Sequence, residues 1–174
     1  VVFDTNLGDF ERPSVNRAAE GGASFSWLVM SQGLLPSAPA QWDYRGKLVS
    51  NAGIPASGNV NSVSLDEHEV GPLVDGRDGR YLVTYASVPS SVAVTADVRG
   101  VAIHVRRFHW PHGNATPVGF SPEPQTLQQN PLRILETGGI AYHGSTKSHW
   151  TLAWRSSSTA PALYTVRVGY SGSP

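Results

Sequence analysis

The chain has 174 residues, with 13 basic and 13 acidic side chains and a formal net charge of zero. This balance disfavours a sequence-independent nucleic-acid surface, which needs an excess of Lys and Arg. The absence of cysteine excludes a disulfide scaffold, a thiol nucleophile and a cysteine-ligated zinc. No hydrophobic run approaches the roughly 18 residues of a membrane-spanning helix, so we expect no membrane span.

The N-terminal third of the chain alternates weak strand signals with breakers. We expect residues 1–22 to form an arm or linker, because they show no regular period. A first strand is predicted where Phe25, Trp27 and Val29 alternate with other residues. Prolines and glycines interrupt residues 36–55 around short strand signals at 47–50 and then at 59–65. The same breakers place Trp42 and Tyr44 in a loop.

An acidic region follows, and it ends in two Asp-Gly pairs. Its acidic residues are Asp66, Glu67, Glu69, Asp75 and Asp78. Oxygen-rich loops can bind calcium, but this spacing is not that of an EF-hand. We interpret the region as a solvated loop and turn, with Arg77 in the turn and calcium binding left open.

The stretch from Gly79 to Trp110 carries the strongest strand pattern of the chain. Tyr81, Val83 and Tyr85 alternate with other residues, and apolar residues alternate again from 92 to 98 and from 101 to 105. A period of two with one apolar side predicts strands with one buried face. The phase slips at Arg99-Gly100, which predicts a bulge or a turn.

Residues 111–131 are rich in proline and glycine and are predicted to form a long loop. A loop of about twenty residues is unusual in a compact domain and often has a function. Trp110 and His112 lie at its start, and Asn114 begins a glycosylation sequon. His104, His109 and His112 match no regular zinc-ligand spacing, so we expect no metal site there.

The C-terminal part predicts a hairpin around Gly138-Gly139, followed by strands at 150–155 and 164–170 and a tail at 171–174. Residues 23–170 are therefore predicted to form one all-β domain, an antiparallel β-sandwich of eight to ten strands with jelly-roll or Greek-key connections. No internal repeat of 20 to 50 residues is evident, which argues against a propeller.

The sequence contains no nucleophile elbow, no metalloprotease helix and no phosphate-binding glycine loop. We therefore expect a protein that is not an enzyme and uses no cofactor and no metal. The residues expected on its exposed binding loops are Trp42, Tyr44, Asp75, Arg77, Asp78, Trp110, His112 and Asn114. A structural or recognition module fits this profile.

The composition and the closing strand Pro161-Ala-Leu-Tyr-Thr-Val-Arg-Val-Gly-Tyr170 resemble capsid proteins of small icosahedral RNA viruses. The resemblance implies a shell or protruding domain on the virion surface that associates with copies of itself. Its loops, at 71–79 and 111–131, would then meet a host receptor or glycan. A basic genome-packaging arm is absent, which favours an excised outer domain.

Two alternatives share the same predicted sandwich. Gly79-Arg-Tyr-Leu-Val-Thr-Tyr85 is similar to a strand of trimeric heads of the complement and tumour-necrosis-factor type, which implies an extracellular trimer. A carbohydrate-binding module is the other alternative, with Trp42 or Trp110 stacking on a sugar. Fold alone does not separate the three.

Overall fold

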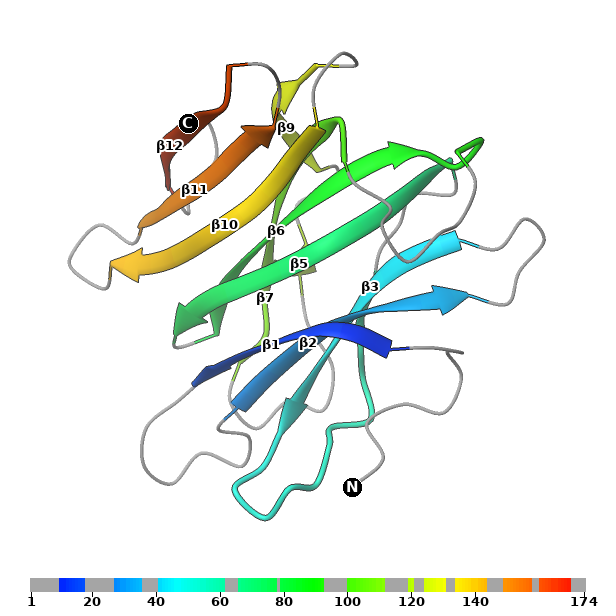
Figure 1. Cartoon of the computed structure of the whole chain (residues 1–174). Helices are drawn as coiled ribbons and strands as arrows, with labels where there is room; N and C mark the ends of the chain where they lie inside the picture. Colours follow the sequence, from blue (N-terminus) through cyan, green and yellow to red (C-terminus); the bar gives the residue numbers. More distant parts are fainter. Residues whose placement is uncertain are drawn as a thin grey trace.

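A computed structural model describes residues 10–17, 27–35, 41–61, 66–77, 79–92, 100–111, 119–120, 124–130, 134–143, 149–157 and 160–169. These residues form twelve strands and no helix, and every strand pairing is antiparallel (Figure 1). Ten of the strands have five residues or more. The predicted antiparallel all-β class is confirmed.

The strands form three sheets, each from one continuous part of the chain. Sheet 1 has the order β1 (Phe10–Arg17), β2 (Trp27–Leu35), β3 (Gln41–Val49) and β4 (Val60–Asn61). Sheet 2 contains β5 (Glu67–Arg77), β6 (Arg80–Pro89), β7 (Ala102–His109), β8 (Gly119–Phe120) and β9 (Gln125–Gln129). Sheet 3 contains β10 (Ile134–His143), β11 (His149–Ser157) and β12 (Ala162–Gly169).

Strands that follow each other in the chain also pair with each other, so each sheet is a meander. The one departure is β9, which pairs with β7 beyond the short β8. β8 pairs with the Phe108 end of β7, and β9 pairs with its Ala102 end. Sheet 2 lies between sheets 1 and 3, which gives three packed layers (Figure 1).

β6 explains why sheet 2 occupies the middle, because all eight residues from Tyr81 to Val88 are buried. The odd-numbered Tyr81, Val83 and Tyr85 belong to a first core against sheet 1, whereas Leu82 and Ala86 belong to a second core against sheet 3. Side chains alternate between the two faces of a strand. One strand therefore contributes to both cores.

The two cores have similar composition. The first contains Leu28, Met30, Tyr44, Leu48, Val60, Val74, Phe108 and Trp110 besides the β6 residues. The second contains Trp42, Val70, Ile103, Val105, Leu135, Trp150, Leu152, Trp154 and Val168 besides its β6 residues. Each large apolar side chain that is fully buried contributes about 1.5–3 kcal/mol to stability, so both interfaces are substantial.

The strands of the three sheets pair in the same pattern, so residues of one sheet have equivalent positions in the other two. Trp27, Tyr81 and Trp150 stand at equivalent positions of the second strands, opposite Val49, Phe108 and Val168 of the third strands. In the first strands, Val15, Val74 and Ile140 are likewise equivalent. They lie opposite Val29, Val83 and Leu152, each two residues after the aromatic of its second strand.

A bulge recurs at the same place in all three first strands. The register shifts by one residue between Glu11 and Ser14 in β1, between Val70 and Leu73 in β5, and between Thr137 and Gly139 in β10. Bulges of this kind bend a strand locally and are conserved features of a sheet. A shared bulge supports a repeated unit.

The three sheets thus repeat one pairing pattern, which the sequence analysis did not reveal. Equivalent aromatics lie roughly 55 to 70 residues apart, beyond the window of 20 to 50 residues in which most repeats occur. Segments of unequal length between the second and third strands hide the similarity. The sequence patterns of the three units are short and separated by these segments.

Several predicted loops are strands. Trp42 and Tyr44 lie in β3, residues 67–77 form β5, and residues 125–129 of the long loop form β9. The predicted hairpin at Gly138-Gly139 is instead the bulged part of the single strand β10. The predicted arm at 1–22 is a strand from Phe10 to Arg17 and otherwise lies outside the described residues, as does the tail at 171–174.

Candidate functional site

The outer face of sheet 1 is the most distinctive exposed surface of the chain. Val15 of β1 is 60 % exposed and Trp27 of β2 is 39 % exposed, and the half-buried Val29 and Val49 stand beside them in the register. Side chains on the other face of the same strands, such as Leu28 and Met30, are buried in the first core. The outer face also carries Lys47, opposite Val29, and Arg45, opposite Ser31, so it combines an apolar patch with basic residues on β3.

The equivalent positions in sheets 2 and 3 are buried between layers. In sheet 2 they are Val74, Tyr81, Val83 and Phe108, which face sheet 1. In sheet 3 they are the buried Trp150, Leu152 and Val168 and the partly buried Ile140, which face sheet 2. At these four positions the outer face of sheet 1 thus resembles an interface between layers, but no sheet of the described residues covers it. Large apolar patches on a monomer mark interaction sites.

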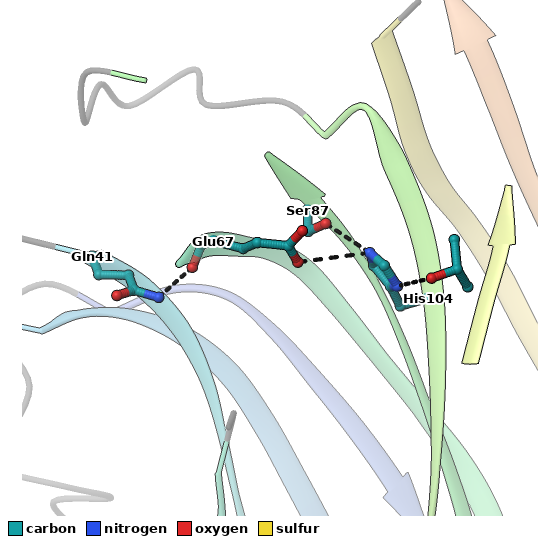
Figure 2. Close-up of polar contacts among 5 residues, drawn as sticks. Gln41, Glu67, Ser87 and His104 are labelled. Atoms are coloured by element: carbon teal, nitrogen blue, oxygen red, sulfur yellow. Dashed lines mark hydrogen bonds and ion pairs between the residues drawn. The ribbon is translucent and has the colours of Figure 1, made fainter. Parts of the chain in front are cut away.

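A second feature is a polar cluster in which Ser87, at the end of β6, and His104, on β7, lie side by side (Figure 2). The Oγ of Ser87 lies 2.7 Å from Nε2 of His104. Oγ1 of Thr126 on β9 lies 3.0 Å from Nδ1 of the same ring. Oε2 of Glu67 lies 3.8 Å from Nε2 of His104, and the backbone carbonyl of Glu67 accepts a hydrogen bond from the side-chain amide of Gln41.

This cluster has the residue types of a serine-hydrolase triad but a different arrangement. In a triad the carboxylate bonds the imidazole nitrogen that does not face the serine. Here Glu67 lies on the nitrogen that contacts Ser87, and a threonine occupies the other side. Ser87 is 1 % exposed, so its hydroxyl has no access to a substrate in this conformation. The cluster joins β5, β6, β7 and β9.

Burial lowers the pKa of His104, and the Glu67 carboxylate opposes this effect only in part. The ring is stacked on Tyr85, with centroids 5.3 Å apart, and it is 8 % exposed. A neutral imidazole bonded to two hydroxyls follows from this environment at neutral pH.

Charged residues also lie in the interface between sheets 1 and 2. Glu69 and Arg106 are buried there, next to the phenol groups of Tyr44 and Tyr85. Burial raises the pKa of both tyrosines, and the charge of Glu69 adds to the rise. Arg106 acts in the opposite direction on both. No local sequence pattern predicts this group, because its residues come from four separate strands, β3, β5, β6 and β7.

The aromatic residues predicted for an exposed binding surface are buried. Trp42 belongs to the second core, whereas Tyr44 and Trp110 belong to the first. The backbone N–H of Trp42 contacts Nδ1 of His68, and that of Trp110 donates to the carbonyl of Gly79. Neither indole is available for stacking on a sugar, which removes the observation behind the carbohydrate-binding alternative.

Asp75 holds the three sheets together. Its Oδ1 accepts from the side-chain amide of Asn16 in sheet 1, and its Oδ2 accepts from the backbone N–H of Tyr142 in sheet 3 at 2.6 Å. Its backbone carbonyl accepts from the indole N–H of Trp150 at 2.9 Å. The residue predicted for a displayed loop is a link between layers.

The remaining predicted residues are not brought together. Arg77 ends β5 opposite Arg80, and Asp78, His112 and Asn114 lie outside the described residues. Glu67 and Asp75 stand near opposite ends of β5, and Glu69 is buried between sheets. In the described part of the chain, no group of three His, Asp or Glu side chains is placed to hold a metal ion.

Comparison of the chain with protein families, with curated proteins and with solved structures found no match. In the described ranges, no helix is long and apolar enough to cross a membrane.

Proposed function

We propose that the chain is a structural module that assembles through a β-sheet face. The observation that carries this proposal is the outer face of sheet 1, where Val15, Trp27, Val29 and Val49 repeat the apolar positions that are buried in sheets 2 and 3. Covering such a face removes apolar surface from water. Each Å² buried stabilises the complex by about 25 cal/mol, which favours association.

Self-association also agrees with the role predicted from the sequence, in which the chain is a capsid surface domain that contacts copies of itself. The virion setting, the host receptor and the trimeric alternative stay predictions. Of the two display loops in that prediction, residues 71–77 belong to β5, so display would rest on the segment after Trp110.

Light scattering over a range of protein concentrations tests the proposal. We expect the wild-type chain, whose monomer mass is 18.6 kDa, to form a dimer or larger species as concentration rises. Val15→Asp should lower this association, because an unpaired charge buried at an interface costs several kcal/mol. Val15 is exposed in the single chain, so the substitution leaves the fold intact.

Ile54→Asp is the matched control, because Ile54 is also exposed but lies in the turn region after β3. It should associate like the wild type. A wild-type chain that stays monomeric at every concentration would contradict the proposal. Equal loss of association in both variants would show that charge in general, rather than the sheet face, is responsible.

A further inference from the structure

We infer that the partner of the sheet 1 face is the outer face of sheet 3 on a second copy of this chain, so that two copies close head to tail into a ring of six sheets. This inference rests on the proposed function and names the occupant of its interface. It follows from how the three sheets already pack on one another.

Each layer contact in the chain uses the same pair of faces. Sheet 2 covers sheet 1 with the face that carries Val74 and Val83, and sheet 3 covers sheet 2 with the equivalent face that carries Ile140 and Leu152. We call the other face of each sheet, which packs on the next sheet in the chain, its back. By the same rule, the face of sheet 1 that carries Val15 and Val29 would pack on the back of a further sheet. Among the residues that the structure describes, the sheet whose back has no further sheet on it is sheet 3.

That outer face of sheet 3 carries exposed apolar residues at interface positions. Leu163 of β12 is 74 % exposed and stands in the register of Ile103 and Tyr44, both fully buried between layers. Ile134 of β10, 37 % exposed, lies on the same face. Four of the six large apolar side chains that are exposed in the described ranges therefore lie on the two outer faces, the others being Ile54 and Val92.

Polar contacts between existing layers also have equivalents across the inferred interface. Trp150 donates its indole N–H to the carbonyl of Asp75 in the layer before it. Trp27 is the equivalent of Trp150, and Ala141 is the equivalent of Asp75. The Trp27 indole, which contacts Asn51 in the single chain, would reach the carbonyl of Ala141 of the second copy.

The basic residues of sheet 3 fit the same scheme. Arg107 of sheet 2 already lies half-buried between layers and donates from Nε to the carbonyl of Gly169, 2.8 Å away. Arg167 is its equivalent on sheet 3, and Ser50 is the equivalent of Gly169 on sheet 1. Arg155 is paired with Glu136, with Nε 2.6 Å from Oε2, so this pair adds no net charge to the interface.

Six stacked meander sheets that close on themselves form a six-bladed β-propeller, which is within the range of four to eight blades that this architecture uses. The contact is heterologous, because different faces meet, and a heterologous contact either closes into a ring or continues into a filament. Two copies of three sheets close the ring without a free apolar face.

Mixing two interface variants of the full chain tests this inference. Val15→Asp blocks the face of sheet 1 and Leu163→Asp blocks the face of sheet 3, and both residues are exposed in the single chain. We expect each variant alone to lose the dimer seen for the wild type. An equimolar mixture should regain a dimer by light scattering, because one unmodified pair of faces remains between the two variants.

The outcomes separate the inference from the proposal beneath it. If Leu163→Asp alone dimerises like the wild type and Val15→Asp does not, sheet 1 pairs with itself and the head-to-tail ring is overturned, whereas the assembly function stands. A mixture that stays monomeric also overturns the ring. If the wild type never associates, both fail. Circular dichroism of each variant, matched to the wild type, shows that the fold is retained.

Discussion

Asp75 accepts a hydrogen bond from the backbone N–H of Tyr142 at 2.6 Å, although the two residues belong to different sheets. The same carboxylate accepts from the Asn16 side chain on the opposite side and from the N–H of Gly76. A single side chain from the middle layer therefore fixes the spacing of the first strands of all three layers. Hydrogen bonds to a charged group are worth about 1.5–3 kcal/mol each.

Asp75→Asn should lower the free energy of unfolding by about 2 kcal/mol, because the new amide places a donor against one of three existing donors. Urea denaturation measures this change. Asp66→Asn is the control, since Asp66 is exposed at the start of the same region and its substitution should change stability by less than about 0.5 kcal/mol. Equal stability of the two variants would contradict the linking role of Asp75.

Gly76→Ala should also destabilise the chain. Gly76 has a φ of +155°, and a Cβ at this position would lie 2.1 Å from the carbonyl oxygen of Arg80. The loss should be at least about 1–3 kcal/mol, seen as a lower thermal midpoint. Gly139→Ala is the matched control, because a Cβ there meets nothing within 4 Å. A tolerated Gly76→Ala would mean that the β5–β6 turn differs from the one described.

His104 should make stability depend on pH. Its pKa is lowered in the folded chain, so the unfolded chain binds more protons as the pH falls through the ordinary histidine range near 6.5. Its contribution is therefore complete above that range and is lost as the pH falls below it. Chemical denaturation at a series of pH values measures the slope, and His104→Gln should reduce it. An unchanged slope would assign the dependence to other groups.

Trp110→Ala should cost about 3–5 kcal/mol, because it empties a fully buried position of the first core. Thermal or urea unfolding measures the loss. Ile54→Ala, at an exposed position, should cost less than about 1 kcal/mol. A small effect of Trp110→Ala would contradict the burial of this residue and support the exposed position expected from the sequence.

The period-two pattern predicted the regular strands well, because one face of each is apolar. Tyr81, Val83 and Tyr85 in β6, and Trp150, Leu152 and Trp154 in β11, lie on buried faces as predicted. The pattern failed where glycine was taken as a breaker. Gly46 lies within β3, where a Cβ would overlap Sδ of Met30 and lie 3.3 Å from its methyl carbon, so this glycine makes room for a core side chain.

The interior charges and the layers could not be predicted from local patterns. His68 and Glu69 look like a solvated loop, yet both are fully buried, because Trp42, Arg106 and the tyrosines that surround them come from distant strands. The exposed apolar patch on the outer face of sheet 1 could not be predicted from local patterns either. Val15 and Val29 have ordinary strand chemistry, and only the register shared with sheets 2 and 3 identifies them as an interface.

β6 supplies side chains to both cores, so it is the strand that the two cores share. Unfolding of sheet 1 or sheet 3 exposes one face of β6, but its backbone amides remain paired with β5 and β7. These amides should therefore exchange with solvent deuterium only when the whole chain unfolds, whereas those of β1 and β12 exchange through smaller local openings. The middle strand sets the cooperativity of the molecule.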